Sequence, residues 1–237
     1  RLRRVLARLG TPGATVSVLV LGGSVEQGAA PPFKGACKGC EGNLWQDVFF
    51  AWLHSSFPAQ VELSTHLVSG AELRLHVDGL RGLAERVRPD LVLVQTSLYD
   101  PLQGRSTSFR LNQTPVYVED EIFIRALLQL PRSPAIIWME LMTGKPILPA
   151  WRFGANQEPD RMLMEYYDVP QVSVRAAWYS HLPFSPEEIW TSDLFHPRLL
   201  GHKLVAVTLA NFFCYELLQA CTAAPLAPGA PLPAPLY

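Results

Sequence analysis

Apolar and polar residues follow two different periods along the chain, and these periods predict strands and helices in alternation. Short runs of valine, leucine and isoleucine bounded by glycine or proline are typical of buried strands. Such runs cover residues 15–21, 91–94, 135–141 and 169–174, and alternation of apolar and polar residues predicts a further strand over 61–67. Between them, apolar residues recur at helical spacing. This spacing predicts helices over residues 1–10, 44–57, 71–87, 116–130, 157–167, 175–181 and 199–221.

The alternation of strands and helices indicates the fold class. Strands separated by helices favour a mostly parallel sheet that is covered on both faces. We therefore predict an α/β fold, a three-layer α/β/α sandwich with a five-stranded, flavodoxin-like sheet and the first strand near its centre. The segments that follow the first three strands of such a sheet open on one edge. This places Ser24, Gly70 and Tyr99 near one another.

The predicted elements account for one domain, and long loops connect several of them. We assign residues 1–222 to this domain and expect Asn43 to cap the second helix. The segment 223–237 is rich in proline and alanine, so we expect it to be extended or disordered. The longest loops, which are often functional in compact domains, cover residues 22–42, 101–115, 142–156 and 183–197.

Composition and charge exclude some classes of partner. The chain has 237 residues, of which 49% are hydrophobic and 17% charged, and this suits one well-buried domain. Its formal net charge of −1 gives no electrostatic footprint for nucleic acid. We also expect no membrane span, because no continuous apolar run approaches about 20 residues.

The four cysteines form two local pairs. Cys37 and Cys40 make a Cys-x-x-Cys motif in a loop rich in glycine and proline, which leaves a disulfide, free thiols or a metal site open. No second such motif or histidine pair stands at ligand spacing, so a metal site is the least favoured of the three alternatives and we assign no metal ligands. A disulfide here would favour a secreted or lumenal location. We expect Cys214 and Cys221, on the last helix, to be buried.

A candidate catalytic residue, Ser24, follows the end of the first predicted strand. Residues 22–28 read Gly-Gly-Ser-Val-Glu-Gln-Gly, so the two glycines allow a sharp turn directly before Ser24. A serine at the carboxyl edge of a parallel sheet can act as a nucleophile if a base lies within hydrogen-bond reach. Asp193 and His196, which precede the last helix, supply a candidate base with a carboxylate to orient it.

Three blocks resemble those of the SGNH (GDSL-type) hydrolases. Residues 22–28 are similar to the family's first block, Gly-Asp-Ser-x-x-x-Gly, with Gly23 where Asp is common. Residues 193–197, Asp-Leu-Phe-His-Pro, resemble its last block, Asp-x-x-His-Pro. Residues 90–100 resemble the block that normally ends Gly-x-Asn-Asp. The Gly-Gly-Ser variant is similar to a branch of SGNH-type proteins in algae and other protists.

The resemblance implies a mechanism and an oxyanion site. Ser24 would attack an acyl carbonyl, His196 would take and return its proton, and Asp193 would orient the imidazole. The N–H groups of Ser24 and Gly70 would bind the oxyanion. Tyr99 stands where the family has the third donor, an Asn side chain, and loss of one such donor typically costs about 10²–10³ in rate.

Two classes of function therefore stay open. The first is a cofactor-independent serine esterase or deacylase for small acyl esters, including O-acetyl groups on carbohydrate. The second is a catalytically weak domain that binds a glycan or protein partner. Trp151, Trp178 and Trp190 could stack on sugars or pack in the core. A flavodoxin-like nucleotide binder is a weaker third reading, because the first loop lacks the Gly-Lys-Ser/Thr of a phosphate-binding loop.

Overall fold

The computed structural model describes residues 1–30, 35–37, 39–68, 79–80, 82–83, 85–95, 116–141, 161–178, 184–222 and 232–235. The predicted parallel sheet is present, with five strands in the order β4-β1-β5-β6-β7. All its neighbouring strands run parallel, so the flavodoxin-like order is confirmed. The strands are β1 (Thr15–Gly22), β4 (Gln60–Leu67), β5 (Leu91–Val94), β6 (Ala135–Glu140) and β7 (Gln171–Ser173).

Helices cover both faces of this sheet, which makes the fold a three-layer α/β/α sandwich. The described helices are α1 (Leu2–Leu9), α2 (Trp45–Ser56), α4 (Val116–Leu128), α6 (Val174–Trp178), α7 (Pro186–Ile189) and α8 (Leu199–Thr222). Residues 161–167 are also helical, as are the described residues between 79 and 87. A short antiparallel hairpin of β2 (Ala29–Ala30) and β3 (Gly35–Ala36) lies within the first predicted loop.

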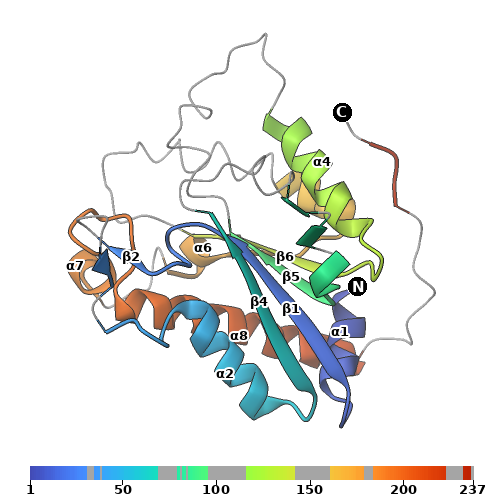
Figure 1. Cartoon of the computed structure of the whole chain (residues 1–237), viewed down its shortest axis with the longest axis horizontal. Coiled ribbons are helices and arrows are strands. Elements are labelled where there is room, and N and C mark those ends of the chain that lie inside the picture. Colours follow the sequence, from blue (N-terminus) through green and yellow to red (C-terminus); the bar gives the residue numbers. More distant parts are fainter. Residues whose placement is uncertain are drawn as a thin grey trace.

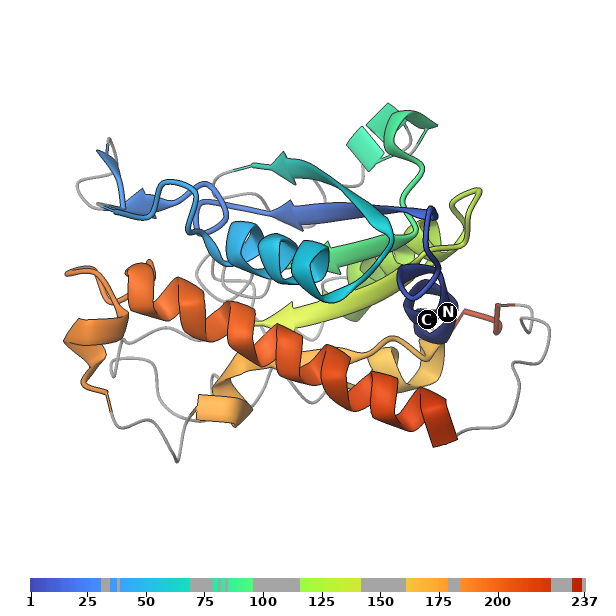
Figure 2. The same cartoon turned by 90° about the horizontal axis from the view of Figure 1, so that it is seen from below.

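The side chains of β1 show how the layers form. Val18 and Val20 point into a hydrophobic cluster that includes α1, α2 and α8. Leu19 and Leu21 point the other way, into a cluster that includes α4 and helical residues 161–167. Successive side chains of a strand face opposite sides of the sheet, so a continuous apolar run is needed when both sides are buried. Helices α2 and α8 lie side by side over one of these faces (Figures 1 and 2).

Two local predictions are corrected at the ends of elements. The strand predicted over 169–174 is shorter, because Val174 already begins α6 and Ser173 Oγ accepts the N–H of Ala176 at 3.1 Å. Asn43 does not cap α2. The N-cap is Leu44, whose N–H donates to Asp47 Oδ2 at 3.1 Å, and the Asn43 amide donates instead to the carbonyl of Glu41.

Helix α8 differs from expectation in two respects. Cys214 and Cys221 are exposed, so their predicted burial is wrong. The helix is also long and apolar enough to cross a membrane by length and composition, and its most apolar window has a mean hydropathy of 1.5. One face of α8 packs in the core through Leu209 and Phe213. Only 22% of this window is buried, and a single helix of this kind is weak evidence for a membrane span.

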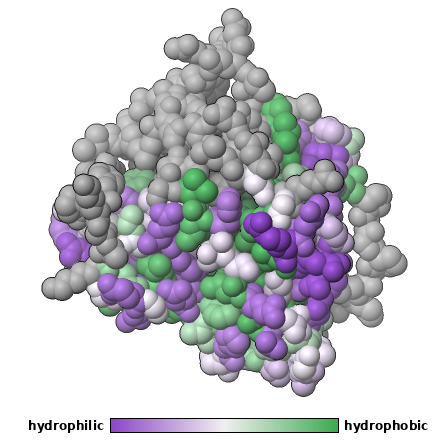
Figure 3. Space-filling model, viewed as in Figure 1, coloured by the Kyte–Doolittle hydropathy of each residue, from purple (hydrophilic) through white to green (hydrophobic). Residues whose placement is uncertain are grey.

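Part of the C-terminal tail contacts the domain. The Arg125 guanidinium of α4 donates to the carbonyl of Pro233 at 2.8 Å, and the Tyr166 hydroxyl donates to that of Ala234 at 2.9 Å. Residues 232–235, which form no helix or strand, therefore lie against the layer that contains α4. Elsewhere on the surface, hydrophobic and hydrophilic residues are interspersed over the described part of the face in Figure 3.

Candidate active site

Ser24 lies in a tight turn directly after β1. Within this turn, the N–H of Gln27 donates to the carbonyl of Gly23 at 3.1 Å and that of Gly28 to the carbonyl of Val25 at 3.0 Å. Gly28 has a φ of +69°, and a Cβ there would lie 2.9 Å from Leu44 Cδ2. Glycine suits this position because it adopts positive φ without steric cost. The turn holds Ser24 at the carboxyl edge of the sheet.

The segment between α7 and α8 carries the two other predicted residues. Two backbone hydrogen bonds join its ends. The Thr191 N–H donates to the carbonyl of His196 at 2.8 Å, and the Arg198 N–H donates to the carbonyl of Ile189 at 2.7 Å. A Cβ on Gly201 would lie 2.6 Å from the same Ile189 oxygen. The missing side chain therefore lets α8 approach α7 closely and closes the loop around His196.

Asp193 is held by its own turn. Its Oδ1 accepts hydrogen bonds from Thr191 Oγ1 at 2.6 Å, from the Phe195 N–H at 2.8 Å and from the His196 N–H at 3.0 Å. Leu194, between them, has a φ of +54°, which is unusual for a side chain with a Cβ. This backbone geometry turns both N–H groups toward one carboxylate oxygen.

Ser24, His196 and Asp193 form a continuous chain of hydrogen bonds. Ser24 Oγ lies 2.9 Å from His196 Nε2, and His196 Nδ1 lies 2.6 Å from Asp193 Oδ2. We assign the ring proton to Nδ1, because the carboxylate can only accept. Nε2 then accepts the Ser24 hydroxyl proton. His196 is only 3% exposed, so the relay is largely shielded from water. This geometry can activate a serine hydroxyl.

The charge of Asp193 is stabilised by its partners. Burial on its own would raise the pKa of this carboxyl, but the hydrogen bonds from Thr191, His196 and Phe195 outweigh it and lower the pKa to about 2. Asp193 is therefore ionised at neutral pH. A fixed negative charge at Nδ1 favours the imidazolium that forms when His196 takes a proton.

Glu26 is a site residue that the sequence reasoning missed. It is fully buried two positions after Ser24, and its Oε2 accepts the N–H of Gly23 at 2.8 Å. Its Oε1 accepts the indole N–H of Trp45 at 2.9 Å. Burial raises the pKa of Glu26 to about 7, against the lowering effect of these hydrogen bonds. A glutamate in a turn normally faces solvent, so the sequence carried no signal for its burial.

His202 is a second buried group beside the relay. Its Nδ1 accepts the backbone N–H of Trp45 at 3.3 Å, and it is 1% exposed. Burial, with a smaller contribution from the neighbouring His196, lowers the pKa of His202 to about 4. The sequence analysis gave it no role. In the structure, Trp45 contacts both Glu26 and His202.

The two predicted oxyanion residues, Gly70 and Tyr99, lie outside the described residues. The strands that precede them are described. Leu67 of β4 is the register partner of Gly22, and Val94 of β5 is the register partner of Leu21. Both strands therefore end beside the turn that carries Ser24. That Gly70 and Tyr99 contribute to the site stays a prediction.

Two of the three tryptophans considered for sugar stacking are core residues. Trp178 and Trp190 are 4% and 3% exposed, and their ring centroids lie 6.4 Å apart. The stacking alternative is therefore wrong for these two, because neither presents a ring face to solvent, and Trp151 lies outside the described residues. Among the described residues, no group of three histidine, cysteine, aspartate or glutamate side chains could hold a metal ion.

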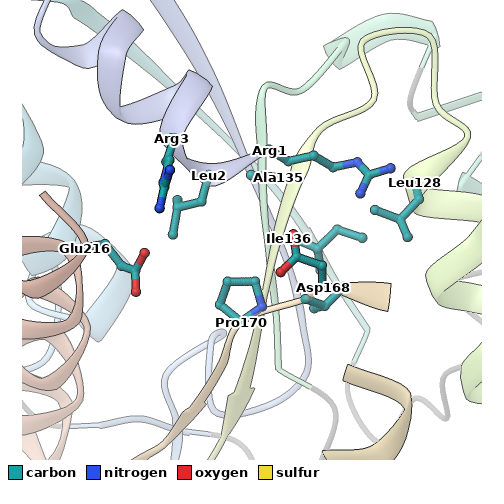
Figure 4. A pocket seen from close by; sticks show the side chains of 10 residues that line it. Arg1, Leu2, Arg3, Leu128, Ala135, Ile136, Asp168, Pro170 and Glu216 are labelled. Atoms are coloured by element: carbon teal, nitrogen blue, oxygen red, sulfur yellow. The ribbon is translucent and has the colours of Figure 1, made fainter. Parts of the chain in front are cut away.

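A cavity of about 320 Å³ lies away from Ser24. Figure 4 shows Arg1 and Leu2 at the start of α1 facing Asp168 and Pro170 across it, with Ala135 at the start of β6. The cavity is thus at the amino ends of the strands, whereas the relay is at their carboxyl ends. It is no part of the candidate site.

Several solved structures share this fold. A two-domain esterase (CEX) active on acetylated mannans matches with a TM-score of 0.71 and 20% identity, over 100% of this chain and 57% of that chain. Axe2, an acetylxylan esterase from Geobacillus stearothermophilus, matches with a TM-score of 0.63 and 20% identity, over 87% of this chain and 96% of that one. The α/β hydrolase LAE5 from the metagenome of Lake Arreo, Spain, matches with a TM-score of 0.64 and 18% identity, over 87% and 98%.

These matches support the three-layer α/β/α fold of the chain. At such identities they carry the fold and not the activity. The chain spans 57% of the length of the two-domain esterase. No protein-family model and no curated protein sequence matches it.

Proposed function

We propose that the protein is a serine esterase of SGNH type that hydrolyses small acyl esters. The observation that carries this proposal is the relay from Ser24 through His196 to Asp193, with contacts of 2.9 and 2.6 Å. A serine hydroxyl bonded to an imidazole that is itself oriented by a carboxylate is the arrangement that acyl transfer requires.

The mechanism follows from the proton positions. His196 Nε2 takes the proton from Ser24 Oγ as this oxygen attacks the acyl carbonyl, and the imidazolium then gives that proton to the leaving alcohol. Water, deprotonated in turn by His196, releases the acid from the acyl-enzyme. Asp193 stays ionised throughout, consistent with a pKa of about 2. No metal or cofactor takes part in these steps.

For the substrate class, we propose acyl esters that include O-acetyl groups on carbohydrate. The support is the similarity in fold to an esterase active on acetylated mannans and to an acetylxylan esterase. The alternative, a catalytically weak domain that binds a glycan or protein partner, is favoured by one observation: Tyr99 occupies the sequence position where the resemblance expects an oxyanion-binding Asn.

We also propose an oxidising compartment for the protein. The structure joins Cys37 to Cys40 in a disulfide, the first of the three alternatives that the Cys-x-x-Cys motif left open. Disulfides persist in secreted and lumenal environments and are rare in reducing ones. Mass analysis of the protein with and without reduction, after alkylation, would test the pairing directly.

The experiment that tests the function is ester hydrolysis by purified protein and matched variants. The substrates are p-nitrophenyl acetate, p-nitrophenyl butyrate and acetylated xylan and mannan oligosaccharides. Ser24→Ala should abolish hydrolysis of each substrate that the parent protein cleaves. Ser55→Ala is the control, because Ser55 is an exposed serine of α2 whose hydroxyl donates to the Trp52 carbonyl of the same helix.

A third variant, Tyr99→Asn, separates the two functional alternatives. If the parent is inactive and this variant gains activity, the oxyanion site is the part that has been lost, and the binding alternative is favoured for the natural chain. If the parent is active and Ser24→Ala is equally active, Ser24 is not the nucleophile. Inactivity of the parent and of Tyr99→Asn on every substrate would contradict the esterase proposal.

A further inference from the structure

We propose that Glu26 is a positioning residue that holds the nucleophile turn in its active geometry, through the Gly23 N–H and side chains from two other elements. Its carboxyl contacts the turn itself, helix α2 and the residue that follows β5. The kinetic part of this inference rests on the proposed role of Ser24, whereas the structural part does not.

The contacts of Glu26 link three segments behind Ser24. Oε2 accepts the N–H of Gly23, the residue before Ser24, at 2.8 Å, and Oε1 accepts the Trp45 indole N–H at 2.9 Å. With its amide nitrogen facing Glu26, Gln95 lies 3.0 Å from Oε1 and 2.8 Å from Oε2. The Glu26 carbonyl in turn accepts the Gln46 side-chain amide at 2.6 Å.

The chemistry of these partners favours the carboxylate. The backbone N–H of Gly23, the indole N–H of Trp45 and the amide nitrogen of Gln95 are all donors, and an ionised carboxylate is an acceptor at both oxygens. A glutamine at position 26 would turn an NH₂ group toward at least one of these donors. Buried donors left without an acceptor cost more than an average hydrogen bond contributes.

Gly22 shows how closely the carboxyl packs beneath the turn. A Cβ on Gly22 would lie 2.6 Å from Glu26 Oε2 and 2.7 Å from its Cδ. The last residue of β1 therefore has no side chain where the Glu26 carboxyl lies. Substitution of Gly22 by alanine should displace this carboxyl while leaving Glu26 itself in the chain.

The test compares Glu26→Gln and Gly22→Ala with the parent protein at pH 8.5. Glu62→Gln is the matched control, because it makes the same carboxylate-to-amide change at an exposed glutamate of the edge strand β4, outside residues 22–28. Hydrogen exchange of the peptide that contains residues 22–28 reports on the turn whether or not the protein is an esterase. The kcat and KM for p-nitrophenyl acetate report on Ser24.

Both variants should speed exchange in residues 22–28 at least about tenfold while the rest of the sheet keeps its protection. For an active parent, kcat should fall about 10- to 100-fold with little change in KM, because a nucleophile displaced by about 1 Å can lose about 10²-fold in rate. Glu62→Gln should change neither readout.

Three results would overturn the proposal. The first is exchange and kcat within twofold of the parent in Glu26→Gln. The second is a uniform loss of protection across the whole chain, which would give Glu26 a general role in stability. The third applies if Glu26→Gln does not fold. In that case, parent-like exchange of residues 22–28 in Gly22→Ala would overturn the proposal. An inactive parent would count against the esterase proposal alone, because the exchange measurement still tests the turn.

Discussion

Ser24 Oγ and His196 Nε2 lie within hydrogen-bond distance, at 2.9 Å, although 172 residues separate them in the sequence. Two backbone devices make this contact. The turn after β1 presents Ser24 at the sheet edge, and the closed segment between α7 and α8 presents His196 to the same edge. The turn after β1 and the segment before α8 are distant in sequence. The hydrogen bond between Ser24 and His196 therefore forms only when α8 packs against the sheet.

On the proposed mechanism, Asp193→Asn should lower kcat for ester hydrolysis strongly, with a smaller effect on KM. An amide at position 193 can donate to His196 Nδ1 and so favour the tautomer in which Nε2 carries the proton and cannot accept one from Ser24. The corresponding change in a serine protease costs about 10⁴ in kcat. Steady-state hydrolysis of p-nitrophenyl acetate measures the effect.

Glu187→Gln serves as the control for this variant, because Glu187 is an exposed residue of the adjoining helix α7. It should retain parent-like kcat and KM. Equal activity of Asp193→Asn and Glu187→Gln would exclude Asp193 from the mechanism.

Glu26 and His202 should have opposite effects on stability between about pH 4.5 and 6.5. The pKa of Glu26 is raised from 4.5 to about 7 in the folded state, so the folded chain binds the extra proton and the free energy of unfolding falls as pH rises through this range. The pKa of His202 is lowered from 6.5 to about 4, so the unfolded chain binds the extra proton and the free energy of unfolding rises with pH. Each effect is roughly 3 kcal/mol.

Urea unfolding from pH 4.5 to 7.5 tests this compensation. In Glu26→Gln, the pH dependence that comes from His202 remains, so the free energy of unfolding should fall as pH is lowered from 6.5. In His202→Asn, the side-chain oxygen can still accept the Trp45 N–H. The pH dependence that comes from Glu26 remains in this variant, so the free energy of unfolding should fall as pH is raised from 4.5. Identical pH slopes in both variants would contradict the pKa directions. Asp193 does not interfere, because its pKa is lowered to about 2 and its contribution is lost only below about pH 4.

Reduction of the Cys37–Cys40 disulfide should lower the free energy of unfolding by roughly 2 kcal/mol. The bond closes a loop with a sequence separation of 3, and short loops give the smallest entropic stabilisation. The pair also packs against Leu44 and Leu199, so it lies between the start of α2 and the start of α8. Unfolding with and without dithiothreitol measures the change.

The exposed cysteines of α8 supply the control for reduction. A Cys214→Ser, Cys221→Ser variant should show the same loss on reduction as the parent. A variant with serine at positions 37 and 40 should show none, and a reductant effect in that variant would mean that the 37–40 bond is not its cause.

Gly201→Ala should destabilise the protein by about 1–3 kcal/mol, the usual cost of overpacking. The added Cβ would lie 2.6 Å from the Ile189 carbonyl oxygen and 2.8 Å from Pro197 Cβ, next to His196, so activity should fall with stability. Gly82→Ala is the matched control, because a Cβ there meets no atom of the described residues within 4 Å. It should leave the thermal midpoint unchanged or raise it, and equal midpoints for both variants would argue against the close approach of α7 and α8.

The sequence by itself determined the local parts of this protein. Runs such as residues 91–94 are apolar throughout because both faces of the sheet are buried. This pattern can be recognised in the sequence without knowledge of any tertiary contact. The turn after β1 was predictable because glycines precede and follow Ser24. The pairing of Asp193 with His196 was predictable because the two residues stand three positions apart in one block, Asp-x-x-His-Pro, that resembles a known family block.

Only the tertiary structure decided the rest. Cys214 and Cys221 fit a core helix by composition, but the rotation of α8 on the sheet exposes them. Glu26 is a charged residue in a turn, which by its type belongs in solvent. Its burial and its raised pKa arise because Trp45 and Gln95, from elements distant in sequence, close over it. Burial and charge state depend on what packs against a residue, and that information lies in contacts between segments rather than in the period of any one of them.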